Sequence, residues 1–153
     1  MEMESSLEGC ANMTAPGAAP FKTAGWVASG VGRGAEFLRL GWVLDELHRK
    51  LGLLPFPGTL NLRVRPEVRE ALFLRRESFL RIADPAEPNC PGYLQRVTLR
   101  ANGRDCRSAY LILPELTMYK DVLEVIAAEN LRQTLGLQDG DPVEVEVVIE
   151  ELR

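Results

Sequence analysis

The sequence has little of the side-chain chemistry on which most hydrolases and zinc proteins depend. Histidine occurs once in 153 residues, as His48, which lies off the apolar stripe of its predicted helix, where a solvated side chain is expected. Without a second histidine, serine–histidine pairs, cysteine–histidine pairs and zinc–histidine sites are excluded. The three cysteines are far apart and include no CxxC pair, which argues against a zinc site or a disulfide framework.

Long apolar runs and an excess of basic residues are also missing. No stretch approaches the roughly 20 apolar residues that cross a bilayer, and the N-terminus lacks the basic-then-apolar order of a signal peptide. The net charge is −4, with 18 Lys and Arg against 22 Asp and Glu. Since duplex DNA binding depends mostly on basic side chains, we expect no nucleic-acid or membrane partner and a reduced, cytoplasmic protein.

What is present is typical of one globular domain. Hydrophobic residues make up 46% of the chain and charged residues 26%, and the length suffices for one sizeable core. Residues 1–22 are small, polar and rich in Pro and Ala, so we expect a disordered leader followed by a single domain over 23–153.

Apolar spacing and turn residues predict several elements. An apolar stripe predicts a helix over 42–51, and Pro66 opens a second over 66–75. The arginines around this second helix alternate with glutamates, which is typical of a solvated, salt-bridged face. Proline and glycine predict a loop over 83–92. Asn102-Gly103 predicts a tight turn between strands 93–100 and 106–113, and alternating valines predict a closing strand over 143–149.

A short predicted strand at residues 26–29 runs into glycines at alternate positions, Gly30, Gly32 and Gly34. Glycines without Cβ atoms let backbone N–H groups approach an anion closely. The spacing matches neither a Rossmann fingerprint nor a P-loop, and a glycine-rich turn without a ligand is the open alternative.

The segment 55–62 (PFPGTLNL) combines a rigid turn with the start of a strand. Side chains alternate on a strand, so Thr59 and Asn61 share one face while Leu60 and Leu62 enter a core. Two neutral oxygen ligands of this kind suit Mg²⁺ when a phosphate-bearing substrate supplies the negative charge. Local hydrogen bonds to the backbone are the alternative role for both side chains.

Residues 122–135 divide into a strand over 122–126, rich in β-branched residues, and a helix over about 128–135. This division puts Glu124 inside a buried strand, where a carboxylate needs a partner and often marks a functional site. In the alternative, Asp121 and Glu124 form the capping box of one longer helix.

Taken together, these motifs resemble the CTP-dependent riboflavin kinase family over about residues 24–150. The resemblance implies an all-β fold, a six-stranded Greek-key-like cradle-loop barrel with two or three short peripheral helices. The segments that carry it are 29–34 (SGVGRG), 57–62 (PGTLNL), 123–127 (LEVIA), 130–132 (NLR) and 135–143 (LGLQDGDPV).

The resemblance also implies a reaction, the transfer of the γ-phosphoryl group of CTP to the 5′-hydroxyl of riboflavin, giving FMN and CDP. It assigns Thr59 and Asn61 to Mg²⁺, and Thr117 and Glu124 to the flavin. Glu124 and Asn61 are the candidate catalytic residues. The residues it assigns to the nucleotide are Gly30, Val31, Gly32, Arg33, Gly34, Ala35, Glu129, Asn130, Leu131 and Arg132.

One departure bears on the choice of nucleotide. Arg33 stands where the family usually carries Glu, and it could grip a phosphate or alter nucleotide preference. A barrel that senses flavin or nucleotide without turnover is the alternative to an enzyme, although a flavin sensor has no need of the metal ligands Thr59 and Asn61.

Overall fold

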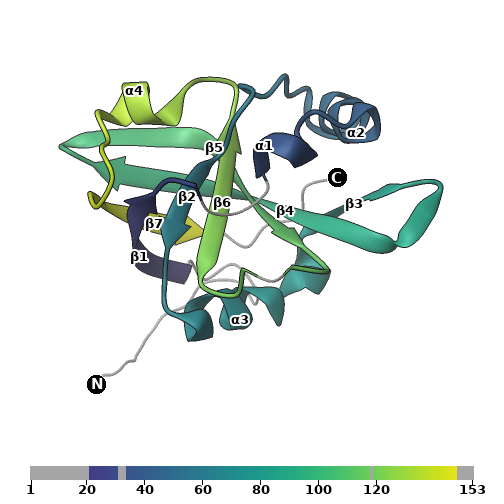
Figure 1. The fold of residues 1–153 in the computed structure, drawn as a ribbon, viewed down its shortest axis with the longest axis horizontal. Helices are drawn as coiled ribbons and strands as arrows, with labels where there is room; N and C mark the ends of the chain where they lie inside the picture. Colours follow the sequence, from purple (N-terminus) through teal and green to yellow (C-terminus); the bar gives the residue numbers. More distant parts are fainter. Residues whose placement is uncertain (1–20, 31–33, 118, 148–153) are drawn as a thin grey trace, which may run out of the picture.

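A closed barrel of six antiparallel strands forms the centre of the computed structural model, which describes residues 21–30, 34–117 and 119–147. The ring runs β4-β5-β6-β2-β1-β7, and β7 closes it by pairing with β4 (Figure 1). The predicted all-β barrel is therefore confirmed. The strands are Phe21–Ala28 (β1), Leu60–Arg63 (β2), Leu80–Asp84 (β3), Glu87–Ala101 (β4), Arg104–Pro114 (β5), Val122–Ala127 (β6) and Pro142–Val147 (β7).

Short helices surround the barrel, with α3 and α4 at opposite ends of it (Figure 1). The predicted helices near 42–51 and 66–75 are confirmed, whereas the third begins at Leu131 because the Asn130 side chain caps it, accepting from the amides of Arg132 and Gln133. In the described residues the helices are Gly34–Phe37 (α1), Gly41–Leu51 (α2), Pro66–Phe73 (α3) and Leu131–Leu135 (α4), with a 3₁₀ turn at Arg76–Ser78 (η1).

The prediction of a loop over 83–92 is wrong. These residues form the end of β3 and the start of β4, a hairpin that projects from the barrel (Figure 1). Its turn is held by the amide of Ala86, which donates to the Asp84 carboxylate at 3.0 Å. Pairing of β4 with β5 begins only at Gly92, although the Pro91 carbonyl already accepts from the amide of Glu115 at 2.8 Å. A stretch of strand with one neighbour over most of its length tolerates proline, whose missing N–H can face outward.

Strand alternation divides the apolar residues between two cores. The barrel interior holds Leu60 and Leu62 of β2 beside Leu123 and Val125 of β6. The opposite face of β4, β5 and β6 is covered by α1 and α2, which form a second apolar cluster. All six residues of β6 are consequently buried, so the strand prediction for Glu124 is confirmed and the capping-box alternative is wrong.

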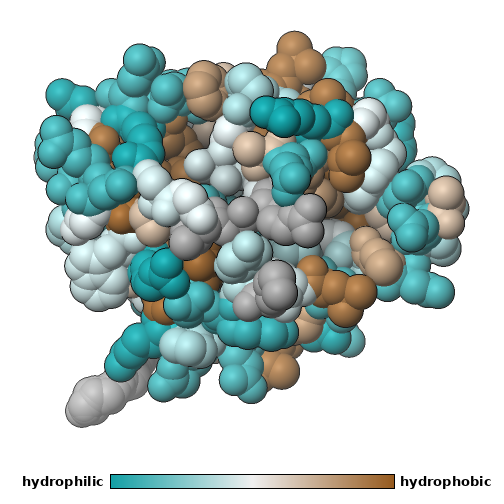
Figure 2. Space-filling model, viewed as in Figure 1, coloured by the Kyte–Doolittle hydropathy of each residue, from teal (hydrophilic) through white to brown (hydrophobic). Residues whose placement is uncertain are grey.

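The surface is mostly hydrophilic on the face shown in Figure 2, with hydrophobic side chains in separate patches. Within the described ranges, no helix has the length and apolar character to cross a membrane. The predicted leader over 1–22 lies almost entirely outside the described residues, although β1 already begins at Phe21.

Candidate active site

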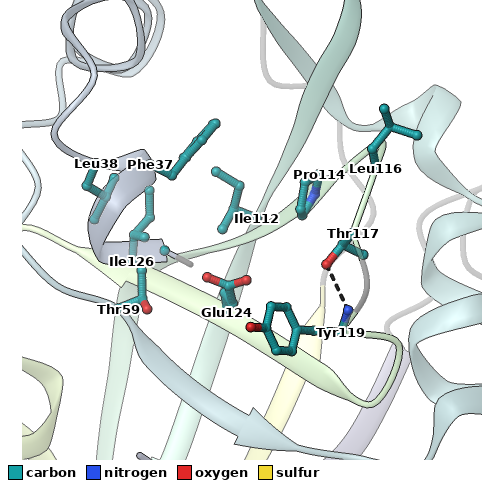
Figure 3. A pocket seen from close by; sticks show the side chains of 11 residues that line it. Phe37, Leu38, Thr59, Ile112, Pro114, Leu116, Thr117, Tyr119, Glu124 and Ile126 are labelled. Carbon is teal, nitrogen blue, oxygen red and sulfur yellow. Dashed lines mark hydrogen bonds between the residues drawn. The ribbon is translucent and has the colours of Figure 1, made fainter. Parts of the chain in front are cut away.

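A cavity of about 540 Å³ lies on the outer face of the barrel, between β5, β6 and α1. Its walls are largely apolar, with the oxygen-bearing side chains of Thr59, Thr117, Tyr119 and Glu124 among them (Figure 3). Size and lining are those of a small-molecule site. The lining residues are Gly34, Phe37, Leu38, Thr59, Ile112, Pro114, Leu116, Thr117, Tyr119, Glu124 and Ile126.

Among the described residues that line these walls, Glu124 is the one acidic side chain. It lies in the middle of β6, directly opposite Asn61 of β2 on one side and Ile112 of β5 on the other. Only 8% of the residue is exposed, and Figure 3 shows its carboxylate between Thr59 and Tyr119. The barrel therefore presents a nearly buried carboxylate to whatever molecule fills the cavity.

Thr59 and Asn61 lie on the same outward face, as the alternation predicts, while Leu60 and Leu62 are buried inside the barrel. The Thr59 hydroxyl donates to the Asn61 carboxamide oxygen at 2.9 Å, so the two oxygens are adjacent. The turn before them is anchored to the end of β6, where the amide of Phe56 donates to Ala127 O at 2.7 Å.

This pair of oxygens fits a hard cation such as Mg²⁺, because Thr59 and Asn61 are neutral oxygen donors beside the Glu124 carboxylate. Within the part of the chain that the structure describes, no group of three or more His, Cys, Asp or Glu side chains is suited to a metal ion. An ion held here would have the neutral oxygens of Thr59 and Asn61 as ligands, with negative charge available from Glu124 and from a phosphate.

Gly34, the first residue of α1, packs directly against this polar group. A Cβ atom at this position would lie 2.5 Å from the Thr59 hydroxyl oxygen and would also collide with the Glu124 carboxylate. The glycine is needed here for close approach rather than for an unusual φ angle.

A second, smaller cavity of about 140 Å³ adjoins the first. Thr59 lines both cavities and is the wall that they share. The smaller cavity lies between the 56–60 turn and the start of α4. Its lining residues are Phe56, Gly58, Thr59, Leu60, Ala127, Glu129, Asn130, Leu131 and Arg132.

Arg69 of α3 is a further charged group near the large cavity. The residue is only 5% exposed; its Nη2 donates to Pro114 O at 3.2 Å, and its guanidinium lies 5.4 Å from the centre of the Phe73 ring. Burial lowers the pKa of Arg69, and the negative charge of Glu124 partly offsets that effect. The sequence predicts a solvated face for these arginines, which is wrong for Arg69 because α3 packs this side chain inward.

The predicted site residues separate into the two cavities. Thr117 and Glu124, predicted for the flavin, line the large one; residues 129–132, predicted for the nucleotide, line the small one. Gly34 reaches the large cavity, whereas Gly30 and Ala35 line neither. Val31, Gly32 and Arg33 lie outside the described residues.

Sequence patterns missed most of the apolar lining. In the sequence Phe37, Leu38, Ile112 and Ile126 are indistinguishable from core residues, since nothing local shows that they face a cavity. Phe56 is an exception, because the sequence places this large apolar side chain between two prolines of a predicted turn, where no core is expected. In the structure Phe56 is 37% exposed and lines the small cavity.

Comparisons with known proteins agree on one family. The family model CTP-dep_RFKase, described as "Domain of unknown function DUF120", matches residues 27–147. A protein named riboflavin kinase from Pyrobaculum islandicum is 38% identical over 132 residues, which are 84% of this chain and 61% of that protein. Another so named, from Archaeoglobus fulgidus, is 38% identical over 133 residues, 84% of this chain and 55% of that protein.

The length covered differs among relatives. The chain spans little more than half of the Pyrobaculum and Archaeoglobus proteins, but a protein named riboflavin kinase from Methanopyrus kandleri is 33% identical with 84% of each chain covered. The family model covers the barrel from the end of β1 to β7, and its range includes the lining residues of both cavities. This chain therefore belongs to the CTP-dependent riboflavin kinase family, CTP-dep_RFKase.

Proposed function

We propose that this chain is a riboflavin kinase that transfers the γ-phosphoryl group of CTP to the 5′-hydroxyl of riboflavin, giving FMN and CDP. The observation that carries the proposal is the meeting of two cavities at Thr59, beside Glu124 and Asn61. A phosphoryl-transfer enzyme must hold an acceptor and a donor on either side of one reacting group.

The large cavity suits the flavin. Its walls are mainly apolar, which favours burial of a flat aromatic ring system, while Thr117 and Tyr119 lie toward the same space (Figure 3). The small cavity, with Asn130 and Arg132 in its walls, is the place for the nucleotide. Its limited volume is consistent with a pyrimidine base, which CTP and UTP share, and the name of the matching family favours CTP as the donor.

Glu124 would act where the two substrates meet. Its carboxylate is placed to accept a hydrogen bond from the ribityl 5′-hydroxyl, and to take the proton as the new O–P bond forms and the bond to CDP breaks. Little covalent chemistry is needed beyond this, because positioning and charge neutralisation supply most of the rate in phosphoryl transfer.

Thr59 and Asn61 would hold Mg²⁺ through their side-chain oxygens. The ion, when bound, neutralises charge on the phosphates. We also keep as predictions a cytoplasmic location and small-molecule partners only.

The test is a nucleotide panel. Purified protein is incubated with riboflavin, Mg²⁺ and each of CTP, ATP, GTP and UTP, and FMN is measured by chromatography. We expect FMN with CTP, and no FMN when a chelator replaces Mg²⁺. Tight riboflavin binding without FMN from any nucleotide would overturn the kinase proposal and support the sensor.

A further inference from the structure

Three polar side chains meet where β1 ends and α4 begins. One Asp139 oxygen, Oδ1, accepts from the Ser29 hydroxyl and from Arg132 Nη2, both at 2.7 Å. The same Arg132 nitrogen donates to Ser29 Oγ at 2.7 Å and to the Ala28 carbonyl at 3.3 Å. We call Ser29, Arg132 and Asp139 the clasp.

Backbone hydrogen bonds place the clasp firmly. The amide of Val27 donates to Asp141 O at 2.9 Å, and the amide of Gly140 donates to Val27 O at 2.8 Å. The 138–141 turn that carries Asp139 is thus tied to β1 in both directions. The Asp139 side chain is 61% exposed, and a surface ion pair of this kind contributes little to the free energy of unfolding.

The position of the clasp indicates a role other than stabilising the fold. Arg132 lines the small cavity, and Ser29 directly follows Ala28, the last residue of β1. Gly34, the first residue of α1, is held in place by its close packing against Thr59 and Glu124. The clasp therefore fixes the end of β1 relative to a wall of the small cavity, and no clasp residue lines the large cavity.

We propose that Asp139 is a positioning residue for the nucleotide: it holds Arg132 and Ser29 together, and so sets the Arg132 wall of the small cavity against the end of β1 at Ala28 and Ser29. The inference rests on the proposed nucleotide site. It also changes the role expected of Arg132, whose Nη2 orients the chain at Ala28 and Ser29 rather than gripping a phosphate.

The experiment compares Asp139→Ala and Ser29→Ala with the wild-type protein. The matched control is Glu144→Gln, which removes the charge of another exposed carboxylate that is hydrogen-bonded to an arginine; its partner is Arg100 on the β4–β7 seam, and Glu144 makes no bond to a clasp residue among the described contacts. CTP affinity is measured by calorimetry without riboflavin, riboflavin affinity by fluorescence, and KM and kcat by FMN formation.

We expect Asp139→Ala to weaken CTP binding and raise the KM for CTP about tenfold, because the substitution removes the acceptor of the hydrogen bonds from Ser29 and Arg132. Riboflavin affinity and kcat should stay within about twofold of the wild-type values. The control Glu144→Gln should leave both affinities, KM and kcat unchanged. Ser29→Ala should act in the same direction, and the double variant should lose less than the sum because both bonds belong to one group.

The outcomes separate this inference from the proposed function. Unchanged CTP affinity in Asp139→Ala overturns the clasp even if the wild type makes FMN. Weaker CTP binding in Asp139→Ala, with no FMN from the wild type, supports the clasp and overturns the kinase. Equal loss of CTP and riboflavin affinity, or no CTP binding by the wild type, overturns the clasp.

Discussion

At the scale of single residues, the candidate site depends on an absent side chain as much as on those present. Gly34 leaves room for Thr59 and Glu124, and the residues that would hold the metal and accept the proton are packed against its α-carbon. A substitution here changes positions without removing any functional group.

Gly34→Ala should therefore lower FMN formation by roughly 100-fold, since displacement of reacting groups by about 1 Å costs that much. Alanine suits a helix, so the melting temperature should fall only modestly. Gly41→Ala is the matched control, because a Cβ there meets no atom within 4 Å. Wild-type activity in Gly34→Ala would contradict the assignment of the site.

Asn61 is the second residue whose role can be isolated. Asn61→Ala should abolish turnover yet leave riboflavin affinity mostly intact, because Asn61 does not line the large cavity. FMN chromatography and riboflavin fluorescence measure the two effects separately.

Asn89→Ala, an exposed asparagine of the β3–β4 hairpin, is the control for Asn61→Ala and should change neither quantity. If Asn61→Ala loses turnover and riboflavin affinity to the same degree, Asn61 is a structural residue.

At the scale of elements, α3 supports the large cavity from outside. Arg69 reaches from this helix to the carbonyl of Pro114, which itself lines the cavity. Because Arg69 is buried, its hydrogen bond and its charge near Glu124 matter more than those of its exposed neighbours.

Arg69→Met keeps the length of the side chain but removes this donor from the Pro114 carbonyl and one positive charge that interacts with Glu124. We expect the free energy of unfolding to fall by about 1–3 kcal/mol in urea titration. Arg65→Met, at an exposed position just before α3, should leave stability unchanged. Equal free energies of unfolding for the two variants would mean that Arg69 does not contribute to stability.

At the scale of the whole molecule, the barrel closes where β7 meets β4. Arg100 of β4 crosses this seam, with Nη1 3.0 Å from Glu144 and 2.8 Å from Glu146. The hydrogen bond from Arg100 is the largest cause of the lowered pKa of Glu146. A carboxyl group whose pKa is lowered on folding stabilises the protein above its unfolded pKa, and this contribution is lost as the pH falls through the folded value.

Arg100→Gln should therefore lower the melting temperature by a few degrees at neutral pH. The difference from wild type should begin to shrink as the pH falls below the ordinary glutamate pKa of about 4.3. It should be smallest below the lowered pKa of the folded wild type, where Glu146 is protonated in both proteins. Thermal melts of both proteins across this pH range measure the difference in melting temperature. A difference that stays constant with pH would mean that Arg100 acts through packing alone.

Much of the site could be predicted because it depends on local rules. The shared face of Thr59 and Asn61 follows from the two-residue period of a strand, and the placement of Glu124 follows from the β-branched residues around it. The hairpin over 83–92 could not be predicted from the sequence. Proline is rare in strands that have a neighbour on both sides, so prolines indicate a loop. Only the fold shows that β4 pairs with β5 from Gly92 onward, which leaves the proline-containing start of β4 largely with β3 as its neighbour.

The amino-acid order alone determined the alternation of the strands and the rigid turn before Thr59, because each is a property of adjacent residues. Only the tertiary structure decided that β7 pairs with β4, that Thr59 is shared by two cavities and that Arg69 is buried. Those features join residues far apart in the chain, and they exist only once the barrel has closed.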